Sequence, residues 1–143
     1  MKRLALVLAL GLMAGVVGSV RVNAQSFSDV AGKWTLTKSA AWGEVTQKLE
    51  LKDDRFSYRE LDKNGTTLLV ARGDVKVEKI GPFKALRLTN IEGGYSEGEL
   101  GPTNDDRVIL FTKGWNTLTL ALNFDAYRDG EDARTDVYKK SKE

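Results

Sequence analysis

The stretch TLTLALNFD, residues 117–125, alternates large apolar side chains with small or polar side chains. Its apolar positions are Leu118, Leu120, Leu122 and Phe124. Because successive side chains of an extended chain point to opposite faces, a period of two predicts a strand with one buried face. The stretch VTQKLELK, residues 45–52, has the same period and places Val45, Gln47, Leu49 and Leu51 on one face.

Six further segments have β-type patterns and are bounded by turn residues: 33–38, 55–61, 69–77, 83–91, 107–113 and 134–140. Asn64-Gly65 is a strong hairpin signal, and Gly73 inside a strand predicts a bulge or a sharp bend. The polar, glycine-rich segment 92–106 is expected to be the longest loop. Eight sequential strands with short connections predict an all-β, up-and-down antiparallel β-barrel, with a β-sandwich as the alternative.

The N-terminal segment has the features of a secretory signal peptide. Lys2 and Arg3 precede an apolar run over residues 4–20, and Val22-Asn23-Ala24 offers small residues for cleavage. The run is short for a membrane anchor, which is the alternative interpretation. We therefore expect a signal peptide over 1–24, a single domain over 25–143, and export to the periplasm or the cell exterior.

Charge and composition narrow the expected partners. Loss of Lys2, Arg3 and Arg21 would leave 19 of the 22 basic residues against 20 acidic residues. A balanced charge without a basic stripe predicts neither a nucleic-acid partner nor, after cleavage, a membrane partner. The sequence has no cysteine, so no disulfide is expected.

The residue types also argue against catalysis. Without histidine or cysteine, the common nucleophilic triads and most zinc sites are excluded. Glu44, Glu50 and Glu60 are candidate acids by type alone, and the acidic turns at 104–106 and 125–132 lack calcium-loop spacing. We therefore predict a non-enzymatic protein with no catalytic residues, no metal ligands and no cofactor.

The parity of the strands predicts a ligand site inside the barrel. Phe56, Tyr58, Leu120 and Phe124 are expected to line it, and Gln47 or Glu60 to orient a polar group of the ligand. The other interpretation places Gln47 and Glu60 near strand ends, where water would satisfy them.

The motif Gly32-Lys33-Trp34 at the first predicted strand resembles the G-x-W element of the calycin superfamily, which includes lipocalins and fatty-acid-binding proteins. The resemblance is to bacterial secreted lipocalin-like domains. It implies that Trp34 closes one end of the barrel beneath a basic side chain of the last strand, either Arg134 or Lys140.

The last predicted strand is similar to the closing strand of fatty-acid-binding proteins, in which an Arg-x-Tyr pair holds a carboxylate. Tyr138 matches the tyrosine, but Asp136 stands at the arginine position. An acid there should repel a carboxylate, so the comparison implies neutral or cationic ligands. Residues 39–43 also leave no room for the two helices that cover the fatty-acid-binding barrels.

Two functional hypotheses follow. The first is an exported, non-catalytic binding module that holds a small apolar molecule in the barrel. The second is a barrel filled by its own side chains, which meets a protein partner through the 92–106 loop. Cavity volume distinguishes the two hypotheses.

Overall fold

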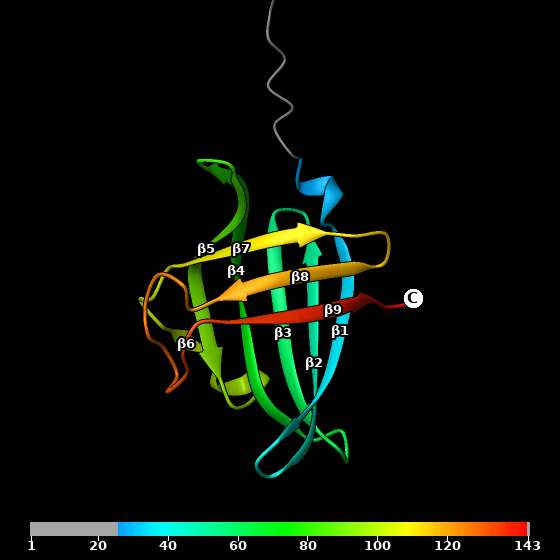
Figure 1. Ribbon diagram of the computed structural model, residues 1–143. Helices are drawn as coiled ribbons and strands as arrows, with labels where there is room; N and C mark the ends of the chain where they lie inside the picture. The colour runs from blue at the N-terminus through cyan, green and yellow to red at the C-terminus, as the bar shows by residue number, and fades with distance from the viewer. Residues whose placement is uncertain (1–25, 143) are drawn as a thin grey trace, which may run out of the picture.

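The computed structural model describes residues 26–142, which form one closed antiparallel β-barrel (Figure 1). A short 3-10 helix, η1 (Phe27–Asp29), precedes the barrel. The barrel strands are β1 (Gly32–Ala40), β2 (Gly43–Lys52), β3 (Arg55–Asp62), β4 (Thr67–Ile80), β5 (Phe83–Gly94), β7 (Arg107–Lys113), β8 (Thr117–Leu122) and β9 (Arg134–Lys140). A second 3-10 helix, η2 (Glu97–Glu99), and the short strand β6 (Gly101–Pro102) lie between β5 and β7.

The strand pairing closes the sheet on itself. Each long strand pairs with the strands that precede and follow it in the chain, and β7 follows β5 in this order. The first strand, β1, also pairs with the last, β9, where Trp34 lies opposite Lys140. The two-residue β6 pairs with the end of β5. This confirms the predicted eight-stranded up-and-down barrel. The β-sandwich alternative is wrong because the pairing of β1 with β9 closes one continuous sheet instead of leaving two separate sheets.

The inward face of each strand carries the predicted apolar positions. In β2, Val45, Gln47, Leu49 and Leu51 are all buried, as the period of two required. In β8, Leu118 and Leu120 are buried as well. The core therefore lies inside the barrel, where one face of every strand contributes to it.

One end of the barrel is closed by the N-terminal segment. Trp34 is fully buried, and its indole Nε1 donates a hydrogen bond of 2.9 Å to the carbonyl oxygen of Val30, which follows η1. The Lys140 ammonium lies 5.9 Å from the centre of the indole ring. Lys140 is thus the basic residue over Trp34. Arg134 is not, because it begins β9 at the opposite end of the barrel.

Gly73 lies at a bulge, as its position inside the strand predicted. The pairing of β4 with β5 shifts there, so that Asn90 and Ile91 of β5 oppose Gly73 alone. Asn90 adopts a positive φ of 50°, and its side chain donates a 2.7 Å hydrogen bond to Asp74. The bulge bends the long β4–β5 hairpin over the barrel.

The predicted end of the 117–125 strand and the predicted 92–106 loop are both wrong. β8 ends at Leu122 instead of residue 125, because Asn123 has a φ of 57° and leaves the extended conformation. The 92–106 segment is not one loop, since its first residues continue β5 and η2 and β6 follow. The longest connection without a strand or helix is 123–133, between β8 and β9.

The predicted signal peptide, residues 1–24, and its cleavage site lie outside the described residues. Within 26–142, no helix is long and apolar enough to cross a membrane.

Candidate functional site

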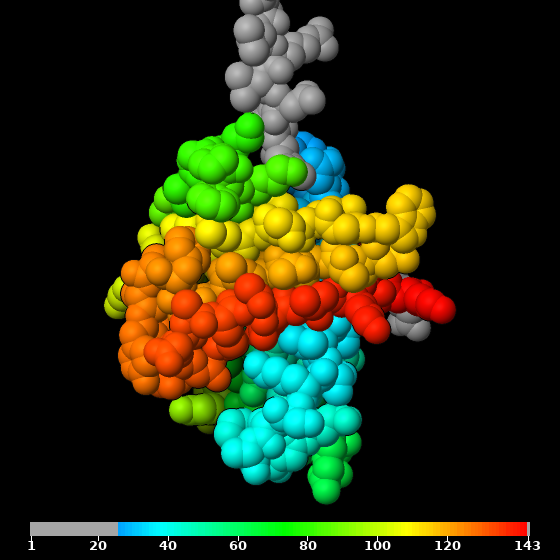
Figure 2. Space-filling view, viewed as in Figure 1, coloured from blue at the N-terminus to red at the C-terminus, as the bar shows by residue number. Residues whose placement is uncertain are grey.

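A cavity of about 800 Å³ enters the barrel at the end opposite Trp34. The connections at this end are β1–β2, β3–β4, 95–106 and 123–133, of which the first two lie at the bottom of Figure 1. Figure 2 shows the surface hollowed below β9, between the 123–133 connection (orange) and the β1–β2 turn (cyan). The barrel is therefore not completely filled by its own side chains.

The inner wall of the cavity is apolar. Phe56 and Leu120, both predicted for the site, line it and are almost completely buried. Other buried apolar side chains in the wall are Val45, Leu49, Leu88, Ile91 and Ile109. The lumen thus offers mainly hydrophobic contact to a molecule that enters it.

A hydrogen-bonded chain of polar side chains crosses this wall from β9 through β2 to β3. The Tyr138 hydroxyl donates to Gln47 Oε1 at 2.7 Å, and Gln47 Nε2 donates to Glu60 Oε2 at 3.0 Å. The Tyr58 hydroxyl donates to the same Oε2 atom at 2.9 Å. Because an ionised carboxylate only accepts, it orients the amide of Gln47, which in turn accepts from Tyr138.

This arrangement places Gln47 and Glu60 on the inner face of the barrel, and their role in orienting a ligand stays a prediction. Gln47 is only 2% exposed and is satisfied by Glu60 and Tyr138, not by water at a strand end. Glu60 is half-buried and lines the cavity. Burial raises the pKa of Tyr58, and the nearby Tyr138 and Glu60 raise it further. Burial and the neighbouring Asp136 likewise raise the pKa of Tyr138.

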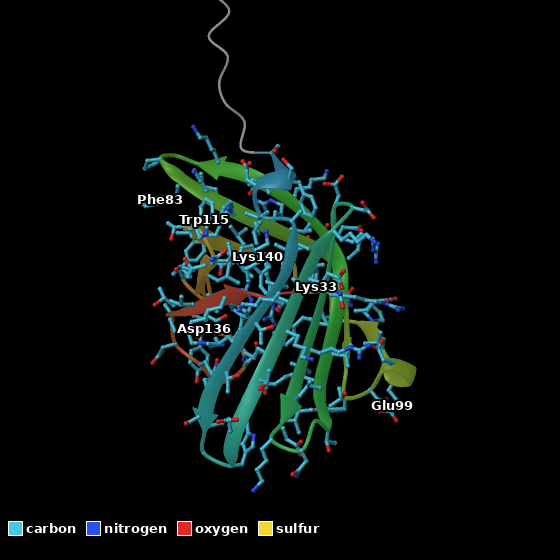
Figure 3. The ribbon with its side chains drawn as sticks, turned by 90° about the vertical axis from the view of Figure 1, so that its right-hand side faces the viewer. Lys33, Phe83, Glu99, Trp115, Asp136 and Lys140 are labelled. Atoms are coloured by element: carbon cyan, nitrogen blue, oxygen red, sulfur yellow. The ribbon has the colours of Figure 1, made fainter. Side chains whose placement is uncertain are left out.

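Asp136 lies close to this chain but has cationic partners. Its Oδ2 atom is 3.8 Å from Lys38 Nζ and 3.3 Å from Arg134 Nε. Figure 3 shows Asp136 on β9, well below Lys140 and toward the open end. The sequence comparison placed Asp136 in the ligand site, and it does line the cavity. Its negative charge, however, is balanced by two basic side chains.

Five of the six predicted ligand-site residues line the cavity: Gln47, Phe56, Tyr58, Glu60 and Leu120. Phe124 does not, and it is 42% exposed. Its predicted inward position assumed that β8 continued past Leu122, but Asn123 turns the chain away. Asn123 has a left-handed backbone conformation, which asparagine adopts more readily than most non-glycine residues, and the strand therefore ends before Phe124.

Other residues of the site were not predicted as ligand contacts. Lys38 and Arg134 come from the mouth ends of β1 and β9, and Trp42 and Tyr95 lie in the connections at the mouth. The inward parity of β9 could have identified Tyr138, because Asp136 and Tyr138 alternate with outward positions. No local signal indicates that Arg134 turns toward Asp136 instead of Trp34.

Ion pairs connect the segments that surround the open end of the barrel. Arg128, in the 123–133 connection, contacts Asp125 at 2.7 Å and Asp105 at 3.1 Å. The hydrogen bonds that Arg128 donates to Asp125 and Asp105 raise the pKa of Arg128, and the same guanidinium lowers the pKa of Asp125. Arg107 joins the same two segments through Asp105 and Asp129. These ion pairs hold the segments 103–106 and 123–133 together beside the opening.

The residues that the structure describes contain no group of three or more acidic side chains placed to hold a metal ion. Comparison with models of protein families, with curated proteins and with solved structures finds no match for this chain. The geometry of the cavity is therefore the feature that bears on function.

Proposed function

We propose that this protein is a non-catalytic binding module, exported after removal of residues 1–24, that holds a small and largely apolar molecule inside its barrel. The observation that carries the proposal is the cavity of about 800 Å³, open at one end and continuous with an apolar wall. Ligand pockets in proteins have volumes of roughly 300–1,000 Å³ and are mostly apolar with a few polar groups.

The polar groups of the cavity support a role in orienting a ligand. Gln47, Tyr58, Glu60 and Tyr138 hold one another by hydrogen bonds, so their positions are set before a ligand enters. Such preorganisation reduces the entropy cost of binding. The alternative function, a filled barrel that acts through its loops, gains no support from an open lumen.

Filling the lumen tests the proposal. Ala71 lines the cavity and pairs with Tyr58, so the Ala71→Phe variant should occupy space that a ligand needs. We expect the wild-type protein to bind a neutral apolar fluorophore such as N-phenyl-1-naphthylamine saturably. The variant should bind it at least tenfold more weakly in a fluorescence titration.

Ala121→Phe is the matched control. Ala121 lies in β8 between Leu120 and Leu122, on the outward face, and is not part of the cavity wall. This variant should bind like the wild type. Absence of saturable binding by the wild type, or equal binding by both variants, would refute the lumen as the site.

A further inference from the structure

The charges around the cavity are paired, with one exception. The charged side chains in its wall are three basic and four acidic residues: Lys38, Arg107 and Arg134, and Glu60, Asp129, Glu131 and Asp136. Asp129 pairs with Arg107, Glu131 with Arg134, and Asp136 with Lys38 and Arg134. Within residues 26–142, Glu60 has no basic partner at ion-pair distance.

The hydrogen bonds of Glu60 do not neutralise its charge, and they leave its Oε1 atom free to accept a hydrogen bond from a ligand. Both donors, Gln47 Nε2 and the Tyr58 hydroxyl, are neutral groups, and both converge on Oε2. Among the described side chains, none donates to Oε1. Since a carboxylate has about four acceptor positions over its two oxygens, Glu60 retains unused capacity.

The surroundings favour a cation beside Glu60. Burial strengthens the interaction of a carboxylate with an opposite charge, because the local dielectric is lower than in water. The rings of Phe56 and Tyr58 are in the same wall, and Trp42 and Tyr95 line the mouth. Aromatic faces attract an ammonium group through their quadrupole.

The cavity would bind an anionic group of a ligand less favourably than a cationic group. The two basic side chains nearest the open end of β1 and β9, Lys38 and Arg134, already share Asp136, and Arg134 also contacts Glu131. A carboxylate or phosphate ligand would have to displace these partners and would approach Glu60. Leaving a buried charge without its partner is costly.

From this imbalance we infer that the ligand of the cavity is an amphiphilic amine, whose protonated nitrogen binds Glu60 Oε1 and whose apolar part extends toward Phe56 and Leu120. The inference rests on the proposed function and adds the chemical class of the ligand. Along β3, Phe56 lies further from the open end than Glu60. The ligand thus enters with its apolar part leading and its ammonium group nearer the mouth.

Three probes with one apolar chain and different head groups test this inference. Decylamine, decan-1-ol and decanoate are titrated separately into the purified protein at pH 7.5, below their aggregation limits, by displacement of N-phenyl-1-naphthylamine. We expect decylamine to bind about tenfold to a hundredfold more tightly than decan-1-ol, as for one hydrogen bond to a charged group. Decanoate should bind most weakly.

The Glu60→Gln variant removes the charge and keeps the shape of the side chain. It should lose the preference for decylamine and bind decan-1-ol as the wild type does. Glu50→Gln is the control, because Glu50 belongs to the same hairpin but lies outside the cavity wall. Thermal unfolding of both variants establishes that they are folded.

The outcomes separate the two proposals. Equal affinity of the wild type for the amine and the alcohol, or tighter binding of decanoate, would overturn the amine inference and leave the lumen site standing. A preference for decylamine that persists in Glu60→Gln would also overturn it. Failure of all three probes and of the fluorophore to bind would overturn the proposed function itself.

Discussion

At the scale of single residues, Trp34 shows how one side chain closes the barrel. Its indole ring is fully buried beneath the Lys140 ammonium, and its only polar atom is bound to Val30. The hydrogen bond ties the segment after η1 to β1, so the ring both fills the end of the core and fixes the N-terminal cover. The burial of the whole indole is the main source of the stability it provides.

Replacement of Trp34 by alanine should therefore destabilise the protein strongly. Truncation of a large buried aromatic residue typically costs about 3–5 kcal/mol, since it removes apolar contact and leaves a cavity. The free energy of unfolding, measured by urea denaturation, should fall by this amount. Trp115→Ala is the matched control, because Trp115 is 90% exposed and its loss should change stability little. Similar values for the two variants would refute the structural role of Trp34.

At the scale of elements, the β4–β5 hairpin depends on the bulge opposite Gly73. A Cβ atom at Gly73 would lie 2.7 Å from the carbonyl oxygen of Thr89 and 2.8 Å from a ring carbon of Phe56. The close approach of β5 to the β4 backbone thus requires a residue without a side chain. Because Phe56 lines the cavity, the bulge also helps to position the wall of the site.

Gly73→Ala should push the two strands apart. We expect a loss of about 1–3 kcal/mol in the free energy of unfolding, the usual cost of forcing an extra carbon into a packed position. Gly101→Ala in β6 is the control, since a Cβ there meets nothing within 4 Å and the backbone needs no positive φ. Equal stability of Gly73→Ala and the wild type would show that the bulge relaxes at no cost.

At the scale of the whole molecule, two phenols link stability to pH: the buried Tyr138 and the partly buried Tyr58. The ordinary pKa of tyrosine is 10.0, and the folded structure raises the pKa of both Tyr58 and Tyr138 above this value. The unfolded chain therefore releases these protons at a lower pH than the folded protein. The stability that the phenols contribute is fully present below pH 10 and is lost as the pH rises beyond it.

The free energy of unfolding should accordingly decrease above about pH 10, by up to about 1.4 kcal/mol per pH unit for each phenol. Urea denaturation between pH 8 and pH 11 measures this slope. The double variant Tyr58→Phe, Tyr138→Phe should have a shallower slope, whereas the exposed Tyr95 can be replaced by phenylalanine without changing it. Identical slopes in the wild type and the double variant would contradict the link.

The sequence by itself determined the class of the fold and most inward positions of the site. A period of two is a local property, so Val45, Gln47, Phe56, Tyr58, Glu60 and Leu120 could be assigned to one face without knowledge of their neighbours. The same periodicity failed at Phe124, because a strand end depends on the backbone conformation of Asn123.

Only the tertiary structure decided which side chains meet. Closure of the barrel places Tyr138 of β9 within 2.7 Å of Gln47 in β2, a separation of 91 residues along the chain. It also pairs Asp136 with Lys38 and leaves Glu60 without a basic partner among the described residues. Ion pairing and cavity volume depend on the register and curvature of distant strands, which a local sequence pattern does not encode.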